Sequence, residues 1–309
     1  MKRTLTLILI LYLSFVAFIV SAQSNIRMNN YWIELNFINP ASVYDKYEAV
    51  FNIAARDQWA GFNGAPQTFF ASASTYLEKQ HIQLGLSLIQ DKAGYTSLTD
   101  VKLTYAYAIM LNNDWQLHLG LNGIYQSVNY DLAKIRVYDP DDPLILQLRS
   151  SNKINTDIGI EITNPFLKIG AASQNLVSLF SRDVNLHANT NIIYGRFYQS
   201  TTSTFDLSGG ICGIQYADIY QAEFNLTGYF KHERDYGRID GSNVFDVGIF
   251  YRTNSEVGLI FGVNISKSFH ISYSYDYHFG AIRLGSYGTN ELMLTYNLNK
   301  KPVCRNCWY

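Results

Sequence analysis

The residues that could do chemistry in this chain are few and widely separated. His270, Asp276 and His278 fall at alternate positions of one segment, so on a β-strand their side chains would share a face. A histidine beside a carboxylate is a proton-transferring pair of the kind that hydrolases use. The sequence has no nucleophile elbow, phosphate loop or paired-histidine metal spacing to accompany them. We therefore interpret them as a polar row facing a lumen, and expect no enzymatic activity, cofactor or bound metal.

A Cys-x-x-Cys pair, Cys304 and Cys307, lies at the extreme C-terminus. Two cysteines cannot complete a tetrahedral zinc site, which needs four ligands. The strand-and-helix context that makes such a pair redox-active is missing too. The pair is expected to form a small disulfide or to bond a partner. The third cysteine, Cys212, falls inside an expected strand, so a disulfide scaffold is excluded.

Period-two alternation marks the elements that must position these residues. In 115–126, 269–278 and 289–299, aliphatic or aromatic residues alternate with small and polar ones. We expect strands near residues 47–56, 68–76, 82–91, 99–111, 115–129, 153–164, 166–174, 186–199, 204–216, 220–231, 243–253, 257–266, 269–277 and 289–299. These make about fourteen, an even number, as in bacterial single-chain barrels.

Composition favours a membrane barrel over a water-soluble sheet protein. Aromatic residues make up 15% of the chain, with 24 Tyr and 18 Phe, and charged residues only 16%, against a usual value of about 25%. A barrel needs this balance because half of each strand faces lipid and half faces a polar lumen. The net charge of −1 gives no reason to expect nucleic-acid binding. The fold class expected is an all-β transmembrane antiparallel barrel.

The N-terminus resembles an export signal. Lys2 and Arg3 precede an apolar run from Leu5 to Val20, which ends in small residues up to Ala22. The alternative is a membrane anchor, but the cleavage-like site favours a removed signal peptide at 1–22. We expect residues 23–46 to form an N-terminal segment that could plug the lumen. The barrel is expected at 47–299, followed by a periplasmic tail at 300–309.

Connection lengths suggest an orientation. If both termini are periplasmic, connections after odd-numbered strands are the long outer loops. The long connections 57–67, 130–152, 175–185 and 278–288 all follow odd strands. The connection 232–242 breaks this rule, either as a periplasmic contact loop or because the strand count slips there.

Charged and polar residues with inward parity form a candidate lumen network. A channel could use such groups to select ions, but an unpaired charge in a confined interior is costly. We therefore favour structural pairing. The candidates are Glu48, Arg56, Asp157, Glu161, Glu223, Asp246, Arg252, His270 and Asp276.

Two blocks of sequence carry a family resemblance. Asn39-Pro40-Ala41 is followed, over residues 56–68, by the pattern R-x-Q-W-x-G-x-x-G-A-P-x-T, and here the chain resembles the PorP/SprF family of type IX secretion proteins. Later pieces keep the family order: Gly85 with 91–94, 105–107, 119–121, 170–175, 248–252, 273–276 and 285–291. Ser42-Val43-Tyr44 replaces a glycine-containing turn, and Cys307 departs from the family whereas Cys304 resembles one of its positions.

The resemblance implies an outer-membrane protein of the type IX secretion or gliding apparatus of Bacteroidota. Such proteins have no known catalytic activity. Some members cooperate with the large translocon channel in exporting a secreted adhesin, or in retaining it at the surface through its C-terminal domain. Others bind periplasmic machine components. The expected partners are these proteins and membrane lipids.

Residues 56–68, which carry the resemblance, would form the first outer loop. Its rings and its Gly/Pro-shaped backbone suit either a lid over the barrel mouth, which we favour, or an anchor for a partner. The candidates are Arg56, Gln58, Trp59, Phe62, Gly64 and Pro66. The alternative to a secretion partner is a transporter of hydrophobic or small solutes, similar to the fourteen-stranded fatty-acid transporters.

Overall fold

The computed structural model describes residues 26–131, 150–180, 188–200, 204–231, 243–253 and 256–300. The expected signal peptide, most of the connection 130–152, the connection 232–242 and the pair Cys304 and Cys307 lie outside these ranges. The strands are β1 (Tyr47–Asp57), β2 (Gln67–Leu77), β3 (Ile82–Ala93), β4 (Thr96–Met110), β5 (Gln116–Tyr130), β6 (Ser151–Thr163), β7 (Leu167–Gln174), β8 (Thr190–Ser200), β9 (Phe205–Tyr216), β10 (Ile219–Lys231), β11 (Asn243–Arg252), β12 (Glu256–Asn264), β13 (Phe269–His278) and β14 (Thr289–Asn299).

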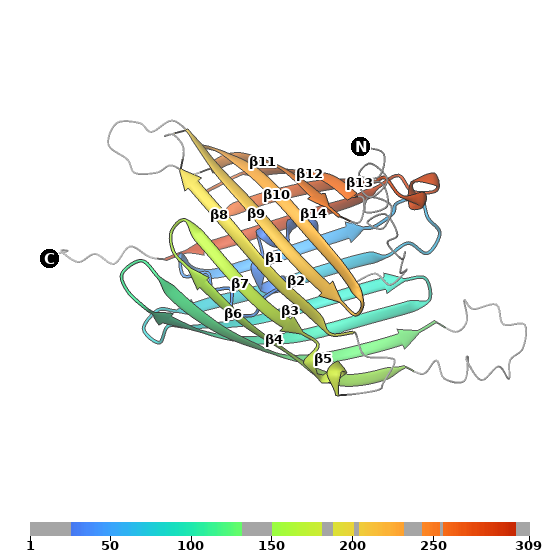
Figure 1. Cartoon of the computed structure of the whole chain (residues 1–309), viewed down its shortest axis with the longest axis horizontal. Helices are drawn as coiled ribbons and strands as arrows, with labels where there is room; N and C mark the ends of the chain where they lie inside the picture. The colour runs from blue at the N-terminus through green and yellow to red at the C-terminus, as the bar shows by residue number, and fades with distance from the viewer. Residues whose placement is uncertain are drawn as a thin grey trace, which may run out of the picture.

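The fourteen strands form one closed barrel, shown in Figure 1. Each strand pairs antiparallel with its neighbours in sequence, and β1 closes the sheet against β14. Closure satisfies every strand edge, which a sheet in lipid requires because the hydrocarbon core offers no water to hydrogen-bond a free edge. The predicted fold class and strand number are confirmed. Among the described residues, no helix is long and apolar enough to cross a bilayer.

The wall alternates because its two faces meet different surroundings. Along β1, Asn52, Ala54 and Arg56 are buried inside the barrel, while Phe51 and Ile53 between them are about half exposed on the outer surface. The register with β2 and β14 keeps each inward residue beside inward neighbours. A shift of one residue would expose the whole polar set to lipid, so the alternation also fixes the register.

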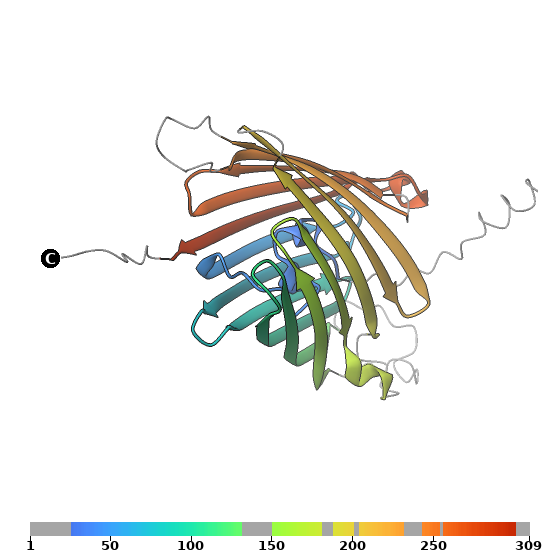
Figure 2. The same cartoon turned by 60° about the vertical axis from the view of Figure 1, so that its left-hand side comes forward.

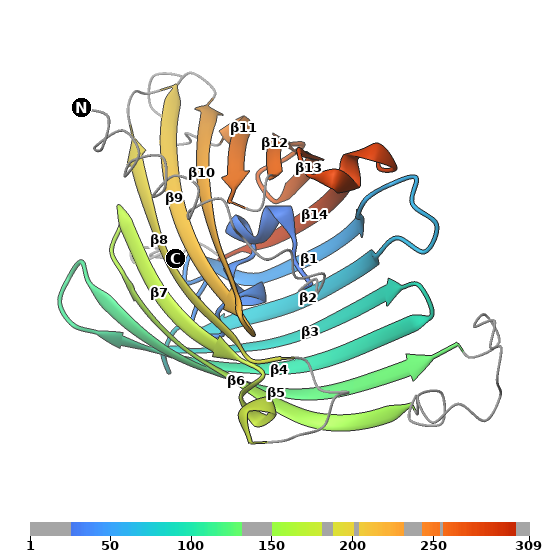
Figure 3. The same cartoon turned by 45° about the vertical axis from the view of Figure 1, so that its right-hand side comes forward.

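Residues 26–46, which we call the inner segment, lie inside the barrel (Figures 2 and 3). The segment contains two short 3₁₀ turns, η1 (Asn29–Trp32) and η2 (Leu35–Phe37). Its apolar side chains form a cluster with inward wall residues, which include Phe70, Tyr194 and Cys212. The segment is therefore a packed part of the barrel interior.

The connections alternate between the two ends of the barrel. Tight turns such as Asn112–Trp115 are held by the Asn112 side chain, which accepts hydrogen bonds from the amides of Asp114 and Trp115 at 2.9 and 2.8 Å. In Figure 1, β14 ends at the left, and the β13–β14 connection with η5 (Ala281–Leu284) lies at the right. The segment 232–242 joins β10 to β11. The strand count therefore does not slip there.

Candidate functional site

A buried ionic cluster on β1 and β10–β14 holds one end of the inner segment. Arg252 pairs with Glu223 at 2.5 Å and with Glu256 at 3.0 Å. Arg56 pairs with Glu291 at 3.2 Å and with Asp276 at 3.5 Å. These side chains are all within a few per cent of full burial. Burial makes any unpaired charge costly, so each member depends on the others.

Asn29 of the inner segment sits at the centre of this cluster. Its side-chain oxygen accepts hydrogen bonds from Arg56 and Arg252 at 2.7 and 2.9 Å. Its side-chain amide donates to Asp276 at 2.9 Å, and its backbone amide donates to Glu291 at 2.6 Å. One neutral amide therefore bridges cations and anions at once, using its donor and acceptor atoms together.

Neighbouring residues of the inner segment extend the same contact. Arg27 pairs with Glu256 at 2.9 Å, and the indole of Trp32 donates to Glu223 at 3.0 Å. Asn30 donates its backbone amide to Glu291 at 2.9 Å. Burial lowers the pKa of Arg27, although Glu256 opposes that shift. The contacts from Arg27 to Trp32, together with the wall groups they meet, form what we call the ionic anchor.

Glu256, Asp276 and His278 place ligand-type atoms within 4.8 Å of one another, as a metal site would. Both carboxylates, however, already face guanidinium groups of the ionic anchor, which would repel a metal cation. The His278 ring nitrogen Nε2 also accepts a hydrogen bond from the Trp59 indole at 3.0 Å. The trio is better explained as part of the ion-pair network.

Glu34 is a buried carboxyl in the middle of the inner segment. Burial raises its pKa to about 8, although hydrogen bonds from Tyr44, Asn36 and Asn52 oppose the shift. A carboxyl with this pKa holds its proton at neutral pH, so it contributes a neutral polar contact there.

The end of the inner segment around Asn39–Ala41 is held by close packing against the wall. Inward-facing Gly120 on β5 and Gly159 on β6 are partners across the sheet. A Cβ on Gly120 would lie 2.2 Å from the Ala41 nitrogen, and one on Gly159 would lie 1.9 Å from the Asn39 side-chain oxygen. Missing side chains on the wall thus make room for Asn39-Pro40-Ala41. We call this contact the glycine seat.

Asn39 locks the chain in this seat. Its side-chain amide donates to the Ile160 carbonyl and to the Tyr194 hydroxyl, both at 3.1 Å, and its side-chain oxygen accepts from the Ala41 amide at 2.9 Å. The Asn-Pro-Ala block of the sequence is therefore the part of the inner segment that meets the paired glycines.

The candidate lumen residues fall into separate groups. Arg56, Glu223, Arg252 and Asp276 meet in the ionic anchor. Elsewhere, Asp157 pairs with Lys102 at 3.2 Å, Glu161 with His118 at 3.2 Å, and Asp246 with His270 at 2.8 Å. Glu48 belongs to none of these groups. It is exposed at the start of β1, where the register with β14 shifts between Tyr47 and Ala49.

Sequence reasoning missed several charged or titratable residues of the barrel interior: Arg27, Glu34, Lys102, His118, Glu256 and Glu291. A signal existed for Glu291, because it shares the parity of inward Met293 and Thr295 on β14. None existed for Arg27 or Glu34, which lie on a segment without strand periodicity.

The candidate lid residues divide between wall and loop. Arg56 and Gln58 are buried, whereas Phe62 is about half exposed. The loop packs against the β13–β14 connection: Ala60 and Gly288 share a backbone hydrogen bond of 2.8 Å, and Tyr287 and Ala60 one of 2.7 Å. Gly64 has a positive φ of 76°, which glycine adopts readily because it lacks a side chain. The Pro66 carbonyl accepts a hydrogen bond from the Gln58 amide at 2.9 Å. Trp59 covers the ionic anchor through His278.

Comparison with solved structures shows the fold. The barrel is similar to the CymD monoaromatic hydrocarbon channel, with 13% identity and a TM-score of 0.50, covering 91% of this chain and 95% of that one. It is also similar to a TodX monoaromatic hydrocarbon channel lacking S2 and S3, with 8% identity and a TM-score of 0.51, covering 91% and 96%. No curated protein matches the chain in sequence.

The family comparison shows more than the fold. The family model described as "Type IX secretion system membrane protein PorP/SprF" matches residues 20–296, which include the inner segment, β1 to β13 and most of β14. Family and fold are those of an outer-membrane secretion or transport protein and of no class of enzyme. This chain belongs to the PorP/SprF family of type IX secretion system membrane proteins.

Proposed function

We propose that this barrel binds or anchors a protein at the outer membrane, either an adhesin-type secreted protein held through its C-terminal domain or another component of the type IX machine. The observation that carries the proposal is the inner segment, which is tied to opposite sides of the wall by the ionic anchor and by the glycine seat. A lumen occupied in this way leaves the ends of the barrel as the surfaces for binding. In this proposal both chain termini are periplasmic, and the protein is not an enzyme.

The connections at one end of the barrel support this role. Phe62, Phe279, Leu284 and Tyr287 lie on the neighbouring β1–β2 and β13–β14 connections; we call them the loop patch. Leu284 is 87% and Tyr287 80% exposed. The Phe62 ring packs against Gly285, and the Tyr287 ring against Gly61, which joins the two connections. A joined apolar surface of this kind is typical of protein-binding sites.

The patch also bears on the lid hypothesis. Trp59 would act as the lid, since it covers His278, while Phe62 would serve as a partner anchor because it turns outward. Both roles assigned to this loop from its sequence can therefore coexist in adjacent residues.

The alternative is a transporter of hydrophobic solutes. The fold similarity to hydrocarbon channels favours it, but the inner segment would have to leave its contacts to open a route. Charge pairs and close backbone packing oppose that movement. We therefore place it second.

Copurification tests the proposal. The tagged barrel is extracted from its own cells in mild detergent after cross-linking, and its companions are identified by mass spectrometry. We expect a secreted protein or machine component with the wild type, and at least about a tenfold loss with the pair Leu284→Ser and Tyr287→Ser, because burying two such side chains contributes several kcal/mol. Phe180→Ser, on the separate β7–β8 connection and 90% exposed, is the matched control.

The opposite result would support the transporter. Steady, selective conductance by the purified protein, together with the same companions for the wild type and the double variant, would reject the anchoring proposal. Hydrocarbon uptake that depends on the gene while surface adhesin display stays normal would point the same way.

A further inference from the structure

At the loop end of the barrel, β6 continues past the strand that closes the wall beside it. Strand β6 pairs with β5 along its whole length, but it pairs with β7 only from Ile158 to Thr163. Figure 3 shows β5 and β6 reaching beyond the end of β7. Over residues 151–157, no residue that the structure describes pairs with β6 on the side of β7. We call residues 151–157 the open edge.

The β6–β7 hairpin shows which backbone groups of the open edge point toward β7. At the hairpin turn, the Asn164 amide donates to the Leu167 carbonyl at 2.8 Å. Backbone groups alternate between the two sides of an antiparallel strand, so those of every second residue counted from Asn164 point toward β7. In the open edge these residues are Thr156, Ile154 and Asn152.

Only the innermost of these three amides is satisfied on this side. The Thr156 amide donates to the Asn155 side-chain oxygen at 2.9 Å, and the same oxygen accepts from the amide of Val177, which follows β7, at 3.1 Å. For the amides of Ile154 and Asn152, the described ranges contain no acceptor on this side. Unpaired backbone groups along a strand edge are a template for pairing with another chain.

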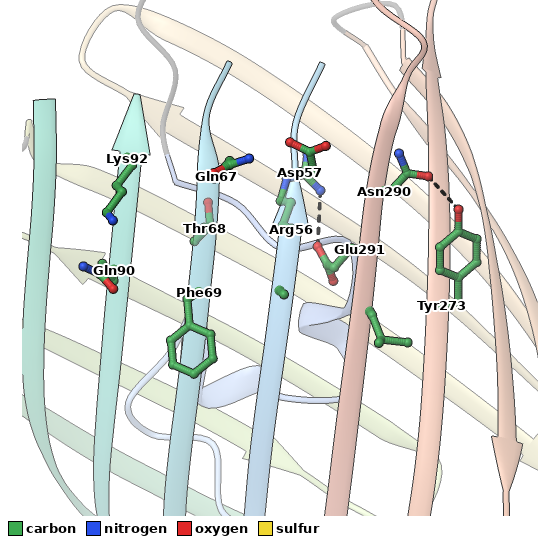
Figure 4. A pocket seen from close by; sticks show the side chains of 12 residues that line it. Arg56, Asp57, Gln67, Thr68, Phe69, Gln90, Lys92, Tyr273, Asn290 and Glu291 are labelled. Atoms are coloured by element: carbon green, nitrogen blue, oxygen red, sulfur yellow. Dashed lines mark hydrogen bonds and ion pairs between the residues drawn. The ribbon is translucent and has the colours of Figure 1, made fainter. Parts of the chain in front are cut away.

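Polar rows on the outward face mark where the wall leaves the membrane at the loop end. A polar side chain that faces hydrocarbon is costly, so such a row lies at the border of the lipid-facing band. On one side of the barrel, the row lies at the loop ends of β14, β1, β2 and β3, as Figure 4 shows. Its members, in cross-strand order, are Asn290, Asp57, Gln67 and Lys92.

A matching row crosses β7 to β10. Its members, in cross-strand order, are Ser173, Asn191, Gln215 and Tyr220. Hydrogen bonds of 2.7, 3.4 and 3.3 Å link their side chains in that order. Because Ser173 is the cross-strand partner of Ile158, the open edge begins where this row ends and lies on its water side. The Ile154 side chain, within the open edge, is 76% exposed.

An open strand edge in water fits one kind of occupant. Amides and carbonyls at strand spacing pair with another extended backbone, which then adds to the sheet as a further strand. The Ile154 side chain offers a cross-strand contact to an apolar residue of that strand. We propose that the open edge binds an extended segment of the protein that the barrel holds at the outer membrane. This inference rests on the proposed function and gives it a second contact besides the loop patch.

Two substitutions at Ile154 test this contact. Ile154→Pro removes the amide donor and places a ring where a partner backbone would approach. It spares the β5 ladder, because that amide points away from β5. Ile154→Ala keeps the amide and is the matched control. In copurification from cross-linked cells, we expect Ile154→Pro to lose its companion at least about tenfold and Ile154→Ala to keep most of it. Heat-dependent migration in detergent gels shows that each variant is folded.

Hydrogen exchange provides a second measurement. In the isolated barrel, the peptide 151–157 should exchange faster than the peptide 158–163, because its amides toward β7 lack strand partners. With the companion bound, exchange of 151–157 should slow by about tenfold or more. Unchanged exchange on binding would overturn the proposal. Equal loss of the companion in Ile154→Pro and Ile154→Ala would also overturn it, because the contact would then belong to the side chain.

The same experiments separate this inference from the proposed function. A companion that Ile154→Pro keeps, but that the pair Leu284→Ser and Tyr287→Ser loses, would reject the open edge and leave the proposed function standing. No companion with the wild type would reject both.

Discussion

The ionic anchor and the glycine seat hold the same inner segment by opposite means. At the anchor, wall side chains reach inward and surround Asn29 with charges. At the seat, the wall withdraws, and the Asn39–Ala41 backbone fills the space left by Gly120 and Gly159. The ionic anchor depends on a complete set of charged partners. The glycine seat depends on the wall having no side chains at Gly120 and Gly159.

These two designs fail in different ways. A buried charge that loses its partner keeps its desolvation cost, so the anchor is sensitive to any change of charge. A close backbone contact carries no charge but has no spare volume, so the seat is sensitive to any added atom. An anchor of this kind can respond to its surroundings, whereas a seat cannot.

Removing Arg252 should have the largest effect. Arg252→Met leaves Glu223 buried without its cation and Glu256 with Arg27 alone, and breaking a buried pair typically costs about 3–5 kcal/mol. The free energy of unfolding in denaturant should fall by that amount. Arg283→Met, at an exposed arginine of the β13–β14 connection, is the control and should leave stability unchanged. Similar curves for the two variants would contradict the description of the anchor.

The second largest effect is expected from adding a single methyl group at the glycine seat. Gly120→Ala puts a Cβ against backbone atoms of Pro40 and Ala41, and overpacking of this kind costs as much as about 3 kcal/mol. Gly123→Ala, on the same strand with nothing within 4 Å of its Cβ, is the control. Cys212, fully buried beside Tyr31 and Trp32, reports the displacement through faster maleimide labelling, with Cys304 and Cys307 replaced by Ser. If Gly120→Ala labelled at the same rate as the wild type, the added methyl group would have moved the wall strands and not the inner segment.

The wall was predictable from sequence because its cause is local. Every strand meets lipid on one face and the lumen on the other, so alternation alone indicated fourteen strands and the inward parity of Arg56, Arg252 and Asp276. Glu48 shows the limit, since it is exposed despite its parity, at the start of β1 where the register with β14 shifts.

The partners inside the lumen were not predictable, because they depend on closure. Arg56 on β1 meets Glu291 on β14 through a pairing between the two ends of the barrel sequence. The roles of Gly120 and Gly159 need both the β5–β6 register and the path of a separate segment. Neither the Arg56–Glu291 pairing nor the role of the two glycines produces a periodic pattern in the sequence.

Glu34 makes the hold on the inner segment depend on pH. Its pKa is about 8 in the seated segment, because of burial, and 4.5 in an exposed carboxyl. The seated state therefore binds the extra proton between these values, so seating is strongest at low pH and weakens as pH rises to about 8. Between pH 6 and 8 the expected loss is about 2 kcal/mol. Glu34→Gln should abolish this pH dependence. The readout is the rate of Cys212 labelling in the wild type divided by the rate in the variant at each pH. Because both proteins contain the same thiol, its ionisation cancels in this ratio. A flat ratio would reject the shifted pKa.

The smallest expected difference is between Asn29 and Asn39, two fully buried asparagines of the inner segment. Asn29 bonds charged groups directly, whereas Asn39 bonds a carbonyl, a hydroxyl and an amide. Hydrogen bonds to charged groups contribute about 1.5–3 kcal/mol and neutral ones about 0.5–1.5 kcal/mol. Asn29→Ala should therefore loosen the segment about 1 kcal/mol more than Asn39→Ala, read as a larger rise in Cys212 labelling. The same side chain is removed in both variants, so the difference isolates the charge of the surroundings. If Asn39→Ala proved the more damaging, the backbone fixed by Asn39 would outweigh the charges around Asn29, and the seat would be the principal hold.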